Sequence, residues 1–92
     1  MPMSDVLSKE SLKSVHLRIA MIIRRQRKVR NMSQMRLAME MGHQTAGLIS
    51  CAEAGINNKH FNIEHLATIA KILEIPITDL FEGVDKILKK LD

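Results

Sequence analysis

The stretch that most constrains the fold is residues 34–55, QMRLAMEMGHQTAGLISCAEAG, which reads as two short helices joined by a tight turn. Leu37, Ala38 and Met41 stand at i, i+1 and i+4, a spacing that places apolar side chains on one face of a helix. Gly42 follows directly. It is expected to end this helix because a helix commonly closes on a residue with positive φ, which glycine adopts without steric cost.

Polar residues mark the start of each of these two helices. Ser33 is the expected N-cap of the first, and Thr45 that of the second, whose hydroxyl would accept from the first backbone N–H groups of a helix beginning at Ala46. Ala38 is small where two helices must cross closely, and Ile49 would pack the second helix onto the first. The sequence therefore predicts a helix-turn-helix.

Further helices are expected on both sides of this pair. Helical spacing of apolar residues recurs in three segments: Leu12, Val15, Ile19, Ile22 and Ile23; Ile63, Leu66, Ala67, Ile69, Ala70 and Leu73; and Val84, Ile87, Leu88 and Leu91. Asn31 would end the first segment. Asn62 would cap the second, whose apolar residues are all expected to form the second wall of the core. Pro76 fits the first turn of a helix that starts near Ile77. The fold class expected is all-α.

The composition limits the size of the domain, the kind of partner and the location of the chain. Ninety-two residues with 46% hydrophobic content suffice for one small domain, whose core is marginal in size, so that dimerisation would help. The net charge of +4 indicates a polyanionic partner. A single cysteine and no apolar run near 18 residues leave neither a disulfide framework nor a membrane span. With no signal peptide expected, the predicted location is cytoplasmic.

Charge is unevenly distributed along the chain. Between residues 18 and 36 there are seven basic residues and no acidic ones: Arg18, Arg24, Arg25, Arg27, Lys28, Arg30 and Arg36. From Leu37 onward there are five basic residues and eight acidic ones. The end of the first helix is therefore the expected positive pole.

Several landmarks, taken in order, resemble the Xre or phage-repressor (Cro/C1-type) DNA-binding domain over residues 17–81. They are Arg24 and Arg27, Ser33-Gln34, Ile49-Ser50 with Glu53 and Gly55, and the closing run Leu66-Ala67-x-Ile69-Ala70-x-x-Leu73 with Leu80-Phe81. The turn Gly42 to Thr45 is one residue longer than the commonest form in that family. The resemblance implies a five-helix, lambda-repressor-like domain over residues 12–82. An N-terminal arm or helix extension would occupy residues 1–11, and a C-terminal helical extension residues 83–92.

The resemblance also implies a function, namely sequence-specific binding of double-stranded DNA by a repressor-like transcriptional regulator. The expected assembly is a homodimer. Base-facing positions would be Gln44, Thr45, Ala46, Gly47, Ser50 and Cys51. Phosphate contacts would come from Arg24, Lys28, Arg30, Ser33, Gln34, His43, Asn57, Asn58 and Lys59. Arg27 and Glu53 would form a partly buried structural pair.

Two exposed-looking apolar features of the sequence favour an alternative function. Met35 and Met39 stand one turn apart where the family usually has polar residues. Either the N-terminal arm, with Val6 and Leu7, covers them or they bind a protein partner. With the C-terminal apolar stripe, which could alternatively build a dimer, they favour an antitoxin-like or phage-accessory interaction module as the alternative.

Catalysis is not expected. No Ser/His/Asp or Cys/His set lies in a catalytic motif, and no glycine-rich phosphate loop is present. Cys51, His60 and His65 lack the close ligand pairs of zinc sites, so neither a metal nor another cofactor is predicted.

Overall fold

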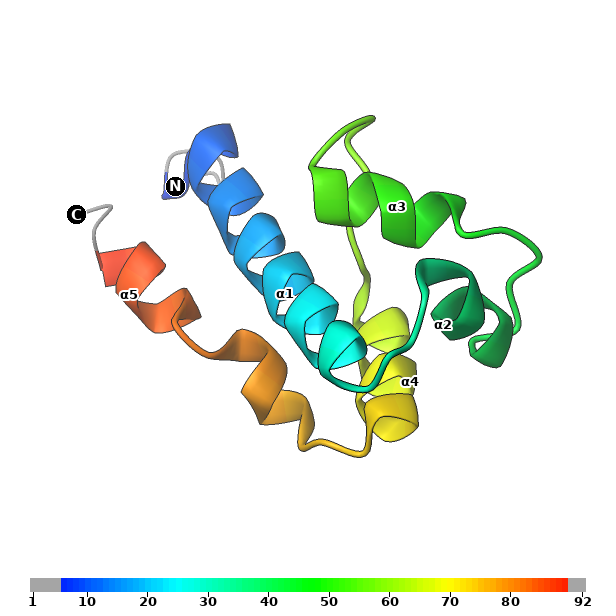
Figure 1. The fold of residues 1–92 in the computed structure, drawn as a ribbon. Coiled ribbons are helices and arrows are strands. Elements are labelled where there is room, and N and C mark those ends of the chain that lie inside the picture. Colours follow the sequence, from blue (N-terminus) through cyan, green and yellow to red (C-terminus); the bar gives the residue numbers. More distant parts are fainter. Residues whose placement is uncertain (1–5, 90–92) are drawn as a thin grey trace.

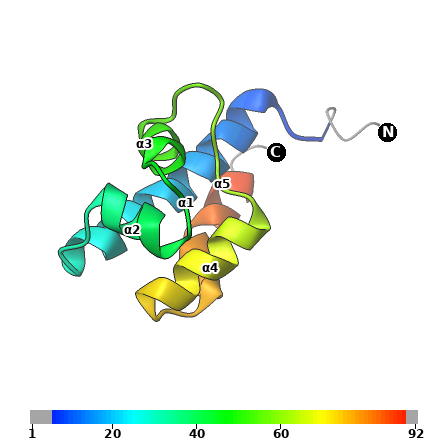
Figure 2. The same ribbon diagram turned by 90° about the vertical axis from the view of Figure 1, so that its right-hand side faces the viewer.

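A computed structural model describes residues 6–89 of the chain, and this part is all-α, as predicted. Its helices are α1 (Lys9–Val29), α2 (Gln34–Glu40), α3 (Gly47–Ala54), α4 (Ile63–Leu73) and α5 (Val84–Lys89), with a 3-10 helix, η2 (Ile77–Phe81), between the last two. The long helix α1 runs through the middle, with α2 and α3 on one side and α5 on the other (Figure 1). Turning the molecule shows α4 below α2 and α3 (Figure 2), and α4 contacts α2 and α1.

Both ends of α1 follow from local chemistry. Ser8 is its N-cap and accepts a hydrogen bond from the backbone N–H of Ser11 at 3.1 Å. The helix therefore begins three residues ahead of the expected domain boundary at residue 12, which makes the end of the N-terminal segment a helix extension. Asn31 has φ 53°, the left-handed conformation expected for it. No helix in residues 6–89, α1 included, is long and apolar enough to cross a membrane.

The core is built from every helix except α5. Its fully buried large side chains are Ile23, Leu37, Ile49, Ile69, Leu73 and Leu80. Burying one such side chain contributes about 1.5–3 kcal/mol relative to leaving it in water. Because Leu37 and Ile49 belong to α2 and α3, the same core that stabilises the chain also fixes these two short helices against α1 and α4.

Helix α4 begins where predicted but faces the core differently. Asn62 is its N-cap, accepting from the N–H of His65 at 2.8 Å, while Nδ1 of His65 accepts from the N–H of Asn62 at 3.1 Å. This reciprocal capping starts the helix at Ile63. Ile63 is 65% exposed and Ala67, one turn later, is also exposed. Their assignment to the core was wrong, because both lie on the flank of the buried stripe.

The C-terminal part differs most from expectation. Pro76 precedes the helical residues as an N-cap, and Ile77–Phe81 forms a 3-10 helix rather than an α-helix. Helix α5 then packs along α1 (Figure 1), with Val84 partly buried against the core and Ile87 half-buried. Arg18 Nε donates to the carbonyl oxygen of Glu82 at 2.7 Å. The C-terminal apolar stripe is thus partly covered by α1 of the same chain, whereas Leu88 is 37% exposed. Its last member, Leu91, lies outside the described residues.

Candidate nucleic-acid interface

The α2–α3 pair forms the corner that the sequence predicts, with one shift. Ser33 Oγ accepts from the N–H of Arg36 at 2.9 Å and caps α2, and Gly42 follows that helix with φ +85°. Helix α3 starts at Gly47, one residue later than expected, so that Ala46 occupies the N-cap position without a side-chain cap. Thr45 Oγ1 accepts from the N–H of Gly47 only at 3.4 Å. Thr45 is therefore a weak cap placed one residue too early.

A buried ion pair connects α1 to α3. Arg27 Nε lies 3.1 Å from Glu53 Oε2, and Arg27 Nη2 lies 2.8 Å from Glu53 Oε1. The two side chains are only 7% and 4% exposed. The remaining nitrogen, Nη1, donates to the carbonyl oxygen of Met32 at 2.8 Å, which fixes the loop before α2. The structure thus joins the two residues that the resemblance pairs, in the two-pronged geometry that makes such pairs strong.

Gln34 also binds Glu53, a role that the sequence did not predict. Its Nε2 donates to Glu53 Oε1 at 3.0 Å, and the side chain is half-buried. Together the three side chains form what is here called the Arg27–Glu53–Gln34 clamp. Gln34 was expected to reach a phosphate. In this structure one of its amide N–H groups is engaged by Glu53 instead, so that Gln34 holds the start of α2 to the end of α3.

The expected base-facing residues form one continuous surface along the turn and α3. Gln44, Thr45, Gly47 and Ser50 are exposed, while Ala46 and Cys51 are half-buried. The opposite side of α3, with Ile49 and Ala52, faces the core. Cys51 Sγ accepts from Asn57 Nδ2 at 3.5 Å, which links α3 to the loop that follows it. Only small side chains therefore cover the outer face of α3, the exposed Ala54 included.

The expected phosphate-contacting residues do not form a single cluster. Arg24 and Lys28 lie on the outer face of α1, where they line a shallow groove with Arg25 and the exposed apolar side chains of Met21 and Val29. The basic residues on α1 and those in the loop after α3 therefore do not gather in one place.

Two other members of that set already have partners within the chain. Arg30 is exposed, and its Nη1 donates to the backbone oxygen and to Oε1 of Gln26, at 3.0 and 2.7 Å. His43 is half-buried and meets the ring of His65 edge-on, with ring centroids 5.7 Å apart. Burial, and next the charge of His43, lower the pKa of His65 below its ordinary value. His43 therefore packs against α4 at the back of the turn.

The loop after α3 carries the remaining phosphate candidates. Gly55 ends α3 with φ +68°, and Asn57 and Asn58 follow with φ 58° and 51°. Asn57, Asn58 and Lys59 are all exposed. Asparagine tolerates the left-handed conformation better than most residues, so this sequence suits the sharp path of the loop. The loop lies at the C-terminal end of α3, whereas the turn with Gln44 leads into its N-terminal end (Figure 1).

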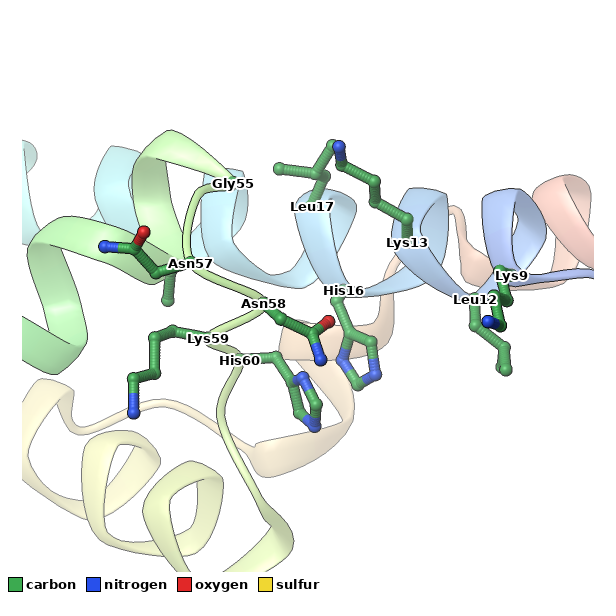
Figure 3. Close-up of a pocket in the computed structure, with 11 residues that line it drawn as sticks. Lys9, Leu12, Lys13, His16, Leu17, Gly55, Asn57, Asn58, Lys59 and His60 are labelled. Atoms are coloured by element: carbon green, nitrogen blue, oxygen red, sulfur yellow. The ribbon is translucent and has the colours of Figure 1, made fainter.

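Sequence reasoning missed a cleft between the N-terminal half of α1 and this loop. There the rings of His16 and His60 stack with centroids 3.9 Å apart and an angle of 19° between their planes (Figure 3). The two residues come from distant parts of the chain, and no local pattern announces that they meet. In residues 6–89 no three His, Cys, Asp or Glu side chains are grouped so as to hold a metal ion.

Met35 and Met39 are 46% and 66% exposed, an apolar pair on the outer side of α2. The sequence suggests that Val6 and Leu7 of the N-terminal arm cover this pair, and for these two residues that suggestion is wrong. Val6 is itself 64% exposed and precedes the N-terminal end of α1, whereas α2 follows the C-terminal end of that helix (Figure 1). The pair therefore stays open to a partner.

Comparison of the chain with models of known protein families, with curated proteins and with solved structures gave no match. What the chain binds must therefore be inferred from its own side chains and their arrangement.

Proposed function

We propose that the chain is a transcriptional regulator of the Xre or phage-repressor kind, which binds double-stranded DNA with α2 and α3 as its helix-turn-helix. The observation that carries this proposal is the outer face of α3. It is exposed, it bears only small side chains such as Gly47 and Ser50, and the Arg27–Glu53–Gln34 clamp connects the helix to α1 and α2. A helix presented in this way fits the major groove.

Small side chains determine how such a helix would recognise sequence. They let the helix backbone approach the groove floor, where the Thr45 methyl group and Ala46 can contact thymine methyl groups. Gln44 is exposed at the turn and has the amide needed for a two-bond contact with adenine. Discrimination would then come from Gln44, Thr45 and Ser50, and the sequence-dependent shape of the DNA would supply the rest.

Charge supports a backbone contribution to binding. Arg24 and Lys28 on α1, and Asn57, Asn58 and Lys59 in the loop after α3, are exposed donors. Contacts with phosphate position a protein on the duplex without reading its sequence. A homodimer in the cytoplasm, binding an inverted repeat with half-sites about one helical turn apart, is the assembly that this mode of binding favours.

A matched pair of charge substitutions tests the proposal. Ser50→Glu places an acidic side chain at the centre of the proposed interface, whereas Ala67→Glu adds the same charge at an exposed position of α4. Fluorescence anisotropy measures binding to a labelled duplex, which should be lost in the first variant and kept in the second. Circular dichroism should show that both variants are folded. Equal affinity of Ser50→Glu and the parent chain would contradict the placement of α3 in the groove.

The alternative function is a protein-interaction module, such as an antitoxin or a phage accessory protein. The exposure of Met35 and Met39 favours it, because flexible thioethers suit adaptable partner surfaces. Co-expression with the product of the neighbouring gene, with the parent chain and with a Met35→Gln, Met39→Gln double variant, distinguishes the two functions. A stable complex that the double variant loses, without any effect on duplex binding, would support the protein partner.

A further inference from the structure

The cleft between α1 and the loop after α3, here called the α1–loop cleft, has a volume of about 640 Å³ (Figure 3). Small-molecule sites in proteins typically measure about 300–1,000 Å³, with apolar walls and a few polar groups. Leu12 and Leu17 from α1 and Ala52 from α3 supply apolar wall, and the loop supplies polar groups. The cleft is thus large enough for a compact ligand and too small for a duplex to enter.

Its charge is of one sign. Lys9 and Lys13 line it from α1 and Lys59 lines it from the loop, and none of the described residues around it is an Asp or Glu. Lys13 and Lys59 extend to different sides of the cleft, away from its centre (Figure 3). Each has a flexible four-carbon stem, so that its ammonium group attracts an anion as a mobile point charge. The lining therefore selects for anions by long-range attraction.

Side chains that can donate hydrogen bonds lie at the centre of the cleft (Figure 3). The His16 and His60 rings stack at 3.9 Å, and the side chain of Asn58 is directed toward them (Figure 3). Burial, and next the charge of His60, lower the pKa of His16 below its ordinary value. A neutral imidazole still carries one N–H donor, so a lowered pKa does not remove the donor capacity of His16. Rings and amide together can donate to several oxygen atoms of one group.

We propose that the α1–loop cleft binds a phosphate group, with His16, His60 and Asn58 as central donors and Lys13 and Lys59 supplying charge from the rim. A phosphate fits better than a single carboxylate, because its greater charge and additional acceptor oxygens match a lining of lysines and several donors. The group can belong to a free small phosphate compound or to the backbone of a duplex that reaches the rim. The proposal goes beyond the role of α3 and does not depend on it.

Titration of the full chain, monitored by ¹H–¹⁵N correlation spectra at constant ionic strength, tests this inference. The probes are inorganic phosphate and adenosine monophosphate, with adenosine as the control that lacks the phosphate and sodium chloride as the control for ionic strength. Both phosphates should shift the amide signals of Gly55, Asn58 and His60 saturably, whereas adenosine and chloride should not. Absence of saturable shifts with either phosphate would overturn the proposal.

Variants assign the binding to the cleft. The double substitution Lys13→Gln and Lys59→Gln should weaken phosphate binding about tenfold, a loss that corresponds to removing two attractive charges. Lys71→Gln with Lys86→Gln removes the same charge from exposed positions of α4 and α5 and should leave the affinity unchanged. His60→Ala removes a central donor at an exposed position and should also weaken binding. Equal affinity in all these variants would place the bound phosphate elsewhere and refute the proposal.

The source of the phosphate is settled by adding a short duplex to the same samples. If the duplex shifts the cleft signals and adenosine monophosphate competes with it, the DNA backbone supplies the group. If the duplex leaves those signals unmoved while the small compounds still bind, the ligand is a free phosphate compound. Ser50→Glu separates the two proposals, because it should abolish duplex binding by α3 and leave the titration with inorganic phosphate unchanged.

Discussion

Glu53 on α3 accepts hydrogen bonds from two nitrogen atoms of Arg27 on α1, at 2.8 Å from Nη2 to Oε1 and 3.1 Å from Nε to Oε2. This contact connects the helix that spans the molecule to the proposed recognition helix. Because both side chains are almost fully buried, neither could be solvated by water if the other were removed. The pair therefore controls how firmly α3 is held.

Arg27→Ala and Glu53→Ala should each lower the free energy of unfolding by about 3 kcal/mol, since each leaves a buried charge unpaired. Arg36→Ala is the matched control, because its pair with Glu40 is exposed and such pairs contribute about 0–1 kcal/mol. Urea denaturation measures all three. If the two buried-pair variants unfold like the parent chain and only lose affinity for DNA, both residues belong to the binding surface.

Stability should fall as the pH is lowered through the titration of two histidines. The folded-state pKa values of His16 and His65 lie below the ordinary 6.5, so near and below that pH the unfolded chain binds protons that the folded chain does not. The melting temperature should therefore drop between about pH 7.5 and about pH 5.5, the range in which histidine titrates.

A His16→Gln, His65→Gln double variant should show a smaller drop over the same range. Glutamine at residue 65 can still accept from the N–H of Asn62 and so keeps the reciprocal cap of α4. Thermal melts by circular dichroism at matched ionic strength provide the measurement. A parent chain whose melting temperature is the same across this range would contradict the assigned direction of both pKa shifts.

Removal of α5 should destabilise the chain rather than only change its assembly. A chain ending at Phe81 loses Val84 from the edge of the core and the acceptor oxygen of Glu82 for Arg18, and should be less stable by about 1–2 kcal/mol. Thermal melting and analytical sedimentation are measured on the same samples. An unchanged melting temperature together with a change from dimer to monomer would instead make α5 the interface between subunits.

Much of the local structure could be predicted because it depends on neighbouring residues. The caps at Ser33 and Asn62 and the left-handed positions at Asn31 and Gly42 are encoded within one helical turn of sequence, and the structure has them all. The Arg27–Glu53 pair was predicted from the resemblance to the Xre or phage-repressor domain. These features position the core and the corner between α2 and α3.

Features that depend on distant parts of the chain could not be predicted in the same way. The stacking of His16 on His60 requires the loop after α3 to reach α1, and the cover over Val84 requires α5 to fold back along that helix. Periodicity shows that a stripe is apolar but not what covers it. Likewise, tertiary packing sets the rotation of α4 that exposes Ile63.

Gln44 should set base preference at one position of each half-site. Its amide is exposed at the turn that leads into α3, where it can donate to and accept from a base edge. Selection from random duplexes should give a motif that Gln44→Ala flattens at that position, with a loss of about 1–3 kcal/mol of discrimination. A long, sharp motif that Gln44→Ala leaves intact would assign the reading to the loop with Asn57 or to the N-terminal arm.

The salt dependence of duplex binding tests the central claim most directly. Each phosphate that the protein neutralises contributes about −0.9 to the slope of log affinity against log salt concentration. The parent chain should therefore bind with a steep negative slope. Arg24→Ala and Lys59→Ala should each make the slope shallower by about one such unit, whereas Lys86→Ala should not. An affinity that does not change with salt, or the absence of duplex binding at low salt, would contradict the account of this chain as a DNA-binding protein.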